Sequence, residues 1–146
     1  MNVNNIRVRT DRRHRTLYND FRNFVVKDMH EMFFLCACLG YLEGKRKPLG
    51  RDGEDRFYSD TFTHEEHASF YAMVIESNDM NFSAIADYKK VIAVMEEYAN
   101  SGMQILLQGV LAEYILQRGD DLRLDTSCSR ELPKVLLAYL NQKASE

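Results

Sequence analysis

The sequence predicts an all-α protein: a compact bundle of about six helices with a long basic loop and an arginine-rich N-terminal arm. Apolar residues recur at helical spacing through most of the chain. The 146 residues include only 2 prolines and 7 glycines, and 45% of them are hydrophobic, which is typical of a globular protein. This length indicates one helical domain, residues 16–146, preceded by the arm, residues 1–15.

The arm is the clearest break in composition. It carries five arginines and one acid, a charge of +4 that leaves −7 for residues 16–146. Because it has few apolar residues to bury, we expect it to be flexible on its own. Its basic side chains are suited to DNA phosphates or to an acidic protein surface. They are Arg7, Arg9, Arg12, Arg13 and Arg15.

Two helices and a loop follow the arm. Residues 16–26 predict a short amphipathic helix, and the next helix runs from an Asp28 N-cap to Gly44. Between residues 32 and 42 it is apolar all round, which places it in the middle of the core. Residues 44–60 combine three glycines with charges of both signs and predict a long functional loop, in which a short strand pair around residues 56–58 would fit. Its basic residues are second candidates for phosphate contacts: Lys45, Arg46, Lys47 and Arg51.

The remaining chain predicts four more helices. Thr63 and Glu66 form a capping box, Asp87 is an N-cap, and Ser129 with Pro133 begins the last helix. We expect the sequence Asn100-Ser101-Gly102 to break the helix that begins at Asp87. The expected ranges are 63–76, 87–99, 103–117 and 129–143, with an irregular stretch before the last helix.

No arrangement of residues predicts catalysis, a metal or a cofactor. His64 and His67 are three residues apart, whereas zinc peptidases need a spacing of four, and a third ligand is not apparent. We therefore expect a protein that is not an enzyme, and an enzyme using His64, His67 and Glu97 is the least favoured alternative. No apolar run is long enough to cross a membrane and the N-terminus does not resemble a secretory signal, so we expect a cytoplasmic protein.

Glu96 and Glu97 lie near the end of the expected 87–99 helix, where the helix dipole disfavours acids. A cationic partner is therefore expected there, with Arg46 or Lys47 as the first candidates. The contact could fix the loop within the chain or join two molecules.

The net charge of −3 argues against a protein that coats nucleic acid over its whole surface.

Three motifs in a fixed order carry a resemblance. They are an apolar helix ending in Leu39-Gly40-Tyr41, the basic segment 44–49, and the segment 95–103 with Glu96-Glu97-Tyr98-Ala99-Asn100. Over residues 25–112 the chain resembles the small DNA phosphorothioation-associated proteins found beside Dnd-type sulfur-modification and restriction systems. Ser101 and Met103 depart from the pattern. The resemblance implies a role in prokaryotic anti-phage defence as an accessory subunit without a known catalytic site.

The leading hypothesis is thus a non-catalytic accessory subunit that binds other proteins of the same defence system, or a second copy of itself, and the DNA backbone. The loop 44–60 and an outer face are expected to bind the protein partner, and the arm to reach DNA or an acidic surface. The alternative is a DNA-binding or regulatory protein that acts alone. The residues assigned to partner binding are Tyr41, Glu96, Glu97 and Asn100.

Overall fold

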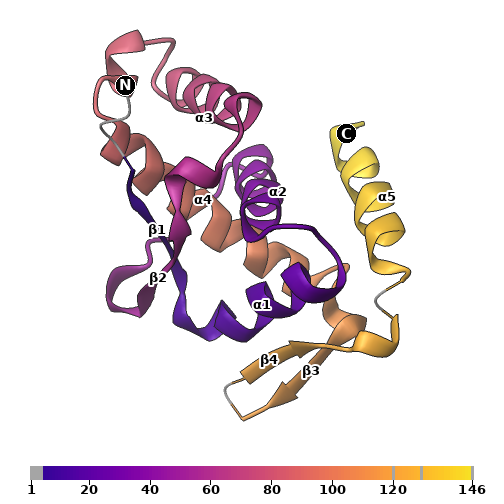
Figure 1. Ribbon diagram of the computed structural model, residues 1–146. Coiled ribbons are helices and arrows are strands. Elements are labelled where there is room, and N and C mark those ends of the chain that lie inside the picture. Colours follow the sequence, from indigo (N-terminus) through magenta and orange to yellow (C-terminus); the bar gives the residue numbers. More distant parts are fainter. Residues whose placement is uncertain (1–4, 120, 129, 146) are drawn as a thin grey trace.

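The computed structural model describes residues 5–119, 121–128 and 130–145 (Figure 1). The expectation of a mainly helical protein is confirmed. Within these residues, however, two small antiparallel sheets accompany five α-helices, so the fold is α+β and a purely all-α class is wrong. The helices are α1 (Arg15–Phe24), α2 (Met29–Leu42), α3 (His64–Ser77), α4 (Tyr88–Gln108) and α5 (Leu132–Ala144). The strands are β1 (Arg7–Asp11), β2 (Gly53–Tyr58), β3 (Ile115–Arg118) and β4 (Asp121–Leu124).

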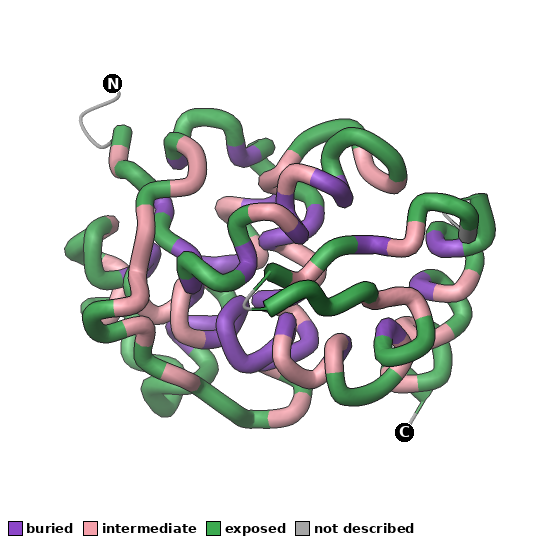
Figure 2. Tube along the Cα trace, turned by 90° about the horizontal axis from the view of Figure 1, so that it is seen from below, coloured by how far each residue is buried: buried purple, intermediate pink, exposed green. Residues whose placement is uncertain are grey.

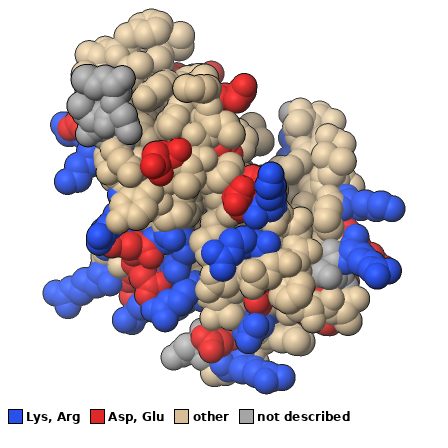
Figure 3. Space-filling view, in the orientation of Figure 1, with Lys and Arg blue, Asp and Glu red and all other residues tan. Residues whose placement is uncertain are grey.

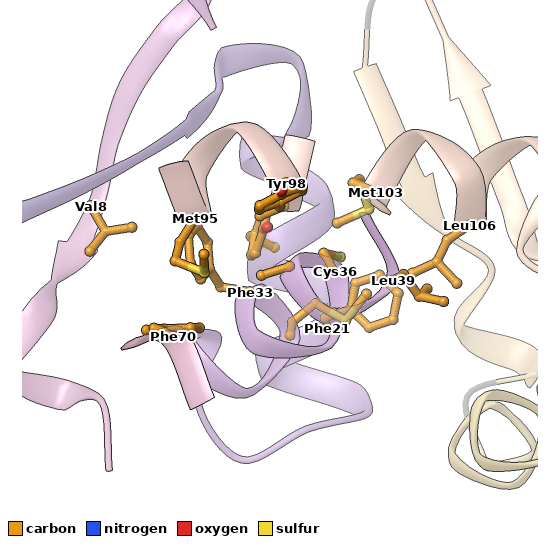
Figure 4. Close-up of a cluster of buried hydrophobic side chains, with 14 of the residues drawn as sticks. Val8, Phe21, Phe33, Cys36, Leu39, Phe70, Met95, Tyr98, Met103 and Leu106 are labelled. Atoms are coloured by element: carbon orange, nitrogen blue, oxygen red, sulfur yellow. The ribbon is translucent and has the colours of Figure 1, made fainter. Parts of the chain in front are cut away.

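Helices α2 and α4 form the centre of the molecule. Side chains from both helices, among them Phe33 and Met95, meet in the core, which Figure 4 shows between Val8 of β1 and Leu106. Gly40 lies against the backbone of α4, because a Cβ atom there would collide with the carbonyl oxygen of Tyr98. The absence of a side chain at Gly40 therefore lets α2 and α4 approach closely.

Helix α4 continues through Asn100-Ser101-Gly102, so the expected break is wrong. The small residues serve packing instead of a turn. A Cβ atom at Gly102 would collide with the carbonyl oxygen of Cys36 on α2, and the Ser101 hydroxyl contacts the backbone oxygens of Tyr98 and Lys45. Close approach of two helix backbones therefore explains a glycine inside a helix.

The N-terminal arm is part of the folded body from β1 onward. Strand β1 pairs with β2, and Val8, opposite Phe57, is fully buried. The expected flexible arm ending at residue 15 is therefore wrong for residues 7–15. A strand near residues 56–58 is confirmed, but its partner comes from the arm and not from the loop itself. The first four residues lie outside the described part of the chain.

The β3–β4 hairpin replaces the end of the helix expected at 103–117. Gly109 follows the last residue of α4, and the strands pair from Ile115 with Leu124 to Arg118 with Asp121. In Figure 1 the hairpin lies below α1. Asp20 of α1 fastens it: the Leu124 N–H donates to this carboxylate at 3.1 Å.

The other helix ends follow the predicted signals. Thr63 and Glu66 form the capping box of α3, and the Asp87 carboxylate accepts from the Lys89 N–H at 3.0 Å. Helix α5 has a proline in its first turn as expected and buries Leu132, but the predicted N-cap Ser129 lies outside the described residues. Exposed segments surround the buried ones in the view from below (Figure 2). In the described part of the chain, no helix combines the length and apolar character needed to span a membrane.

Candidate nucleic-acid interface

The arginines of the arm lie beside acids, most of them from β2 and the turn before it. Arg7 pairs with Asp55 at 3.1 Å, and the Nε of Arg15 donates to Glu54 at 2.9 Å. Basic and acidic side chains accordingly alternate over β1, β2 and the start of α1 in Figure 3. Arg9 differs, since its guanidinium donates to the Gly53 carbonyl oxygen at 3.0 Å. The arm is thus held by a segment of opposite charge.

The basic loop is tied to α4. Arg46 Nε lies 2.9 Å from Glu97 Oε1, which confirms the expected cationic partner and makes it an ion pair within the chain. Asn100 is only 5% exposed and donates to the Lys47 carbonyl oxygen at 3.2 Å, so placing it on an outer face was wrong. The Tyr41 ring packs edge-on against Tyr98, with 5.7 Å between centroids. These residues position the loop.

Glu96 points toward β1 instead of a basic side chain. Its carboxylate accepts from the Arg9 N–H at 2.7 Å and is partly buried. Burial raises the pKa of Glu96 to about 7, and the nearby charges of Glu97 and Asp55 act in the same direction. Glu96 therefore belongs to the contact between β1 and α4.

Three neighbouring hollows lie along the turn Arg12–His14, the start of α1 and the β3–β4 hairpin. The hollow beside Lys47 shares Arg13 with the hollow beside Arg12. The hollow beside Arg12 shares Asp121 with the hollow beside Arg118. Asp121 supplies the one carboxylate among the described lining residues. We call this surface the basic groove. Its basic residues are Arg12, Arg13, Arg15, Lys47, Arg118 and Arg123.

Two buried acids each fix one arginine of this groove. Asp11 and Asp20 are each 2% exposed. Arg13 donates to both carboxylate oxygens of Asp11, at 3.0 and 2.7 Å, and Arg123 does the same with Asp20, at 3.2 and 3.1 Å. Burial alone would raise the pKa of Asp11, but the hydrogen bonds from Arg13 outweigh it and lower the pKa. These bidentate pairs fix the guanidinium groups while leaving them half-exposed.

One end of the groove contains a buried histidine. His14 is 7% exposed and lines the same hollow as Lys47 and Gln104. Burial lowers the pKa of His14 to about 4, and the charges of Arg13 and Lys47 add to this effect. The ring is therefore neutral near pH 7.

The structure brings together some of the predicted phosphate-binding residues and not others. Arg12, Arg13, Arg15 and Lys47 line the groove. The others lie outside it: Arg7, Arg9, Lys45, Arg46 and Arg51. Arg118 and Arg123 were missed because a helix was expected up to residue 117 and an irregular stretch after it. The signal was present in the sequence: Gly119 and Asp120 stand between two apolar-polar segments, a pattern typical of a two-residue hairpin.

The residues of the alternative enzyme hypothesis do not form one site. The His67 ring nitrogen lies 2.6 Å from the Tyr88 hydroxyl at the start of α4, and Glu97 is nine residues further along that helix, a rise of about 13 Å. Residues 5–119, 121–128 and 130–145 contain no group of three side chains placed to hold a metal ion.

A family model described as DNA sulphur modification system-associated protein 4 matches residues 7–125. The match includes β1 and the β3–β4 hairpin, and therefore all six basic residues of the groove; α5 lies beyond it. No curated protein and no solved structure matches the chain.

Proposed function

The chain belongs to the DNA sulphur modification system-associated protein 4 family, and on this premise we propose that it is a non-catalytic accessory subunit that contacts the DNA backbone through the basic groove. Its setting is a prokaryotic DNA-modification-linked restriction or anti-phage defence system. Other proteins of the same system are the proposed protein partners.

The observation that carries the proposal is the charge of the groove. Among the described lining residues, six basic side chains from four segments stand beside one carboxylate, although the chain as a whole has a net charge of −3. A basic groove of this kind can bind phosphates without reading bases. Four of the groove's arginines have acidic partners. Their guanidinium groups are at least half-exposed, and a guanidinium has five N–H donors, so each can donate to a phosphate while it keeps its acid.

DNA retention at low salt tests the groove. The double variant Lys47→Gln with Arg118→Gln removes two positive charges that have no acidic partner in the described structure, so no buried acid loses its counter-charge. We expect weaker binding of duplex DNA in fluorescence anisotropy and a salt dependence shallower by up to about 2 in the log-log slope.

The matched control is Lys89→Gln with Lys90→Gln, which removes the same charge from exposed positions at the start of α4. This control is expected to change binding less than the groove variant. Equal effects of the two variants would mean that net charge, not the groove, governs retention.

The accessory role has a separate test. A tagged chain is purified from cells that also express the proteins encoded beside it. We expect one of these proteins to co-purify with the tagged chain. A monomer that retains none of these proteins would contradict the proposed assembly. It would favour the alternative, a DNA-binding or regulatory protein that acts alone.

A further inference from the structure

We infer that the end of the basic groove around Lys47 binds a single phosphate-class oxyanion. The inference rests on the proposed function, because this anion would be one phosphate of the DNA backbone. The hollow has a volume of about 340 Å³, at the small end of the range for ligand sites.

The lining of this hollow suits an anion. Arg13 and Lys47 supply positive charge, and the side-chain amides of Gln104 and Gln117 supply donors. No aspartate or glutamate is among its described lining residues. An anion would therefore meet donors and cations without direct repulsion from the lining.

Lys47 is held in position before any ligand arrives. Its backbone N–H donates to the Glu97 carbonyl oxygen at 3.1 Å, and its carbonyl oxygen accepts from Asn100 at 3.2 Å. Its ammonium group donates to Gln104 Oε1 at 3.1 Å, which leaves capacity for two further hydrogen bonds. Such pre-organisation lowers the cost of ordering the side chain on binding.

The second cation, Arg13, is also held in position before any ligand arrives. The bidentate contact with buried Asp11 orients the Arg13 guanidinium, and the neighbouring His14 is neutral near pH 7. A neutral imidazole can donate one hydrogen bond to an oxyanion without adding another charge that would repel the two cations. Donors from the turn Arg12–His14, the basic loop and α4 thus line the same hollow.

Leu107 and Leu122 are the apolar residues among its described lining. An apolar wall beside the cations can contact a non-bridging atom that is not hydrogen-bonded. Both an ordinary phosphate and a phosphorothioate, in which sulfur replaces one non-bridging oxygen, have the shared chemistry of a phosphate-class oxyanion. The two anions are therefore tested in separate titrations.

NMR titration of the full chain with inorganic phosphate, and in parallel with inorganic thiophosphate, tests the inference. We expect saturable shifts of the Gln104 side-chain amide and the His14 ring at low ionic strength. The titration with the lower dissociation constant identifies which anion the hollow prefers. Absence of saturable shifts in both titrations overturns the inference.

Two variants keep the test specific. Gln104→Glu is nearly isosteric and places a carboxylate beside Lys47, so phosphate binding should weaken about tenfold or more. Gln142→Glu adds the same charge at an exposed position on α5 and should leave binding unchanged. Equal binding by the Gln104→Glu variant and the parent chain overturns the inference.

The anisotropy test with duplex DNA separates the two proposals. DNA retention that depends on Lys47 and Arg118, without anion shifts in the hollow, would overturn only the single-anion site. Saturable phosphate binding in the hollow, without groove-dependent DNA retention, would overturn only the proposed function.

Discussion

His14 and Glu96 show how burial acts in opposite directions on a base and an acid. The pKa of His14 falls to about 4, so its contribution to stability is complete above its ordinary value of 6.5 and is lost as pH falls toward 4. The pKa of Glu96 rises to about 7, so its contribution is complete below 4.5 and is lost as pH rises through 7. The two effects oppose each other between pH 4.5 and 6.5, and single-residue variants are needed to separate them.

Glu96→Gln should stabilise the protein at alkaline pH. Above pH 7 the partly buried carboxylate is charged, whereas the amide stays neutral and still accepts from the Arg9 N–H. We expect the free energy of unfolding at pH 8 to rise by about 1–2 kcal/mol over the parent chain, with a smaller difference at pH 5. Urea denaturation at both pH values measures this.

Glu97→Gln is the control for that variant, because it neutralises the adjacent acid but breaks an exposed ion pair with Arg46. Its effect should be a loss of at most about 1 kcal/mol. A lower stability of the Glu96→Gln variant at pH 8 would contradict the assigned burial cost.

Sequence reasoning at this scale could find Glu97 but not Glu96. The helix dipole predicts a cation near the end of a helix, and Arg46 is that cation. The partner of Glu96 is a backbone N–H on a strand 87 positions away, and no side-chain pattern encodes such a contact.

At the scale of elements, local signals predicted where helices begin better than where they end. The caps at Thr63 and Asp87 depend on side chains within three residues and were correct. Asn100-Ser101-Gly102 resembles a turn by the same local rules, yet the packing of α4 on α2 overrides them. The β3–β4 hairpin was missed for a related reason, because the apolar residues of α4 continue at helical spacing into residues 110–114.

Gly102→Ala separates these two interpretations of the glycine. In a helix without neighbours, alanine is more stable than glycine by about 1 kcal/mol. At Gly102 the added methyl group meets the backbone of Cys36, so we expect a loss of about 2 kcal/mol or more in the free energy of unfolding. Chemical denaturation gives the sign directly, and a gain in stability would contradict close backbone packing of α2 and α4.

At the scale of the whole molecule, the sequence separates charges that the fold brings together. By sequence, a +4 arm precedes a −7 body. In the structure the arm pairs with the segment from Asp52 to Asp55, and other basic residues gather in the groove with the hairpin. The charge asymmetry could be predicted from composition. Its location could not, because it depends on the β1–β2 pairing and on Asp20 holding the hairpin against α1.

This arrangement makes Asp52 a competitor of DNA for Arg12. The two side chains are 3.5 Å apart and 46% and 67% exposed, so Asp52→Asn should cost less than about 1 kcal/mol in stability. It frees a groove arginine, and we expect tighter DNA retention and a log-log salt slope steeper by up to about 1. Glu54 is not suitable for this purpose, because the Arg56 side chain that it pairs with is only 5% exposed and would lose its counter-charge.

The matched comparison is Asp55→Asn, which changes the net charge equally but frees Arg7, outside the groove. If the groove binds the backbone, Asp52→Asn strengthens DNA retention more than Asp55→Asn does. If the two variants bind alike, the charge of the molecule attracts DNA without a preferred surface. The pair of variants therefore tests whether folding has concentrated the arm's charge into one place, independently of removing any basic residue.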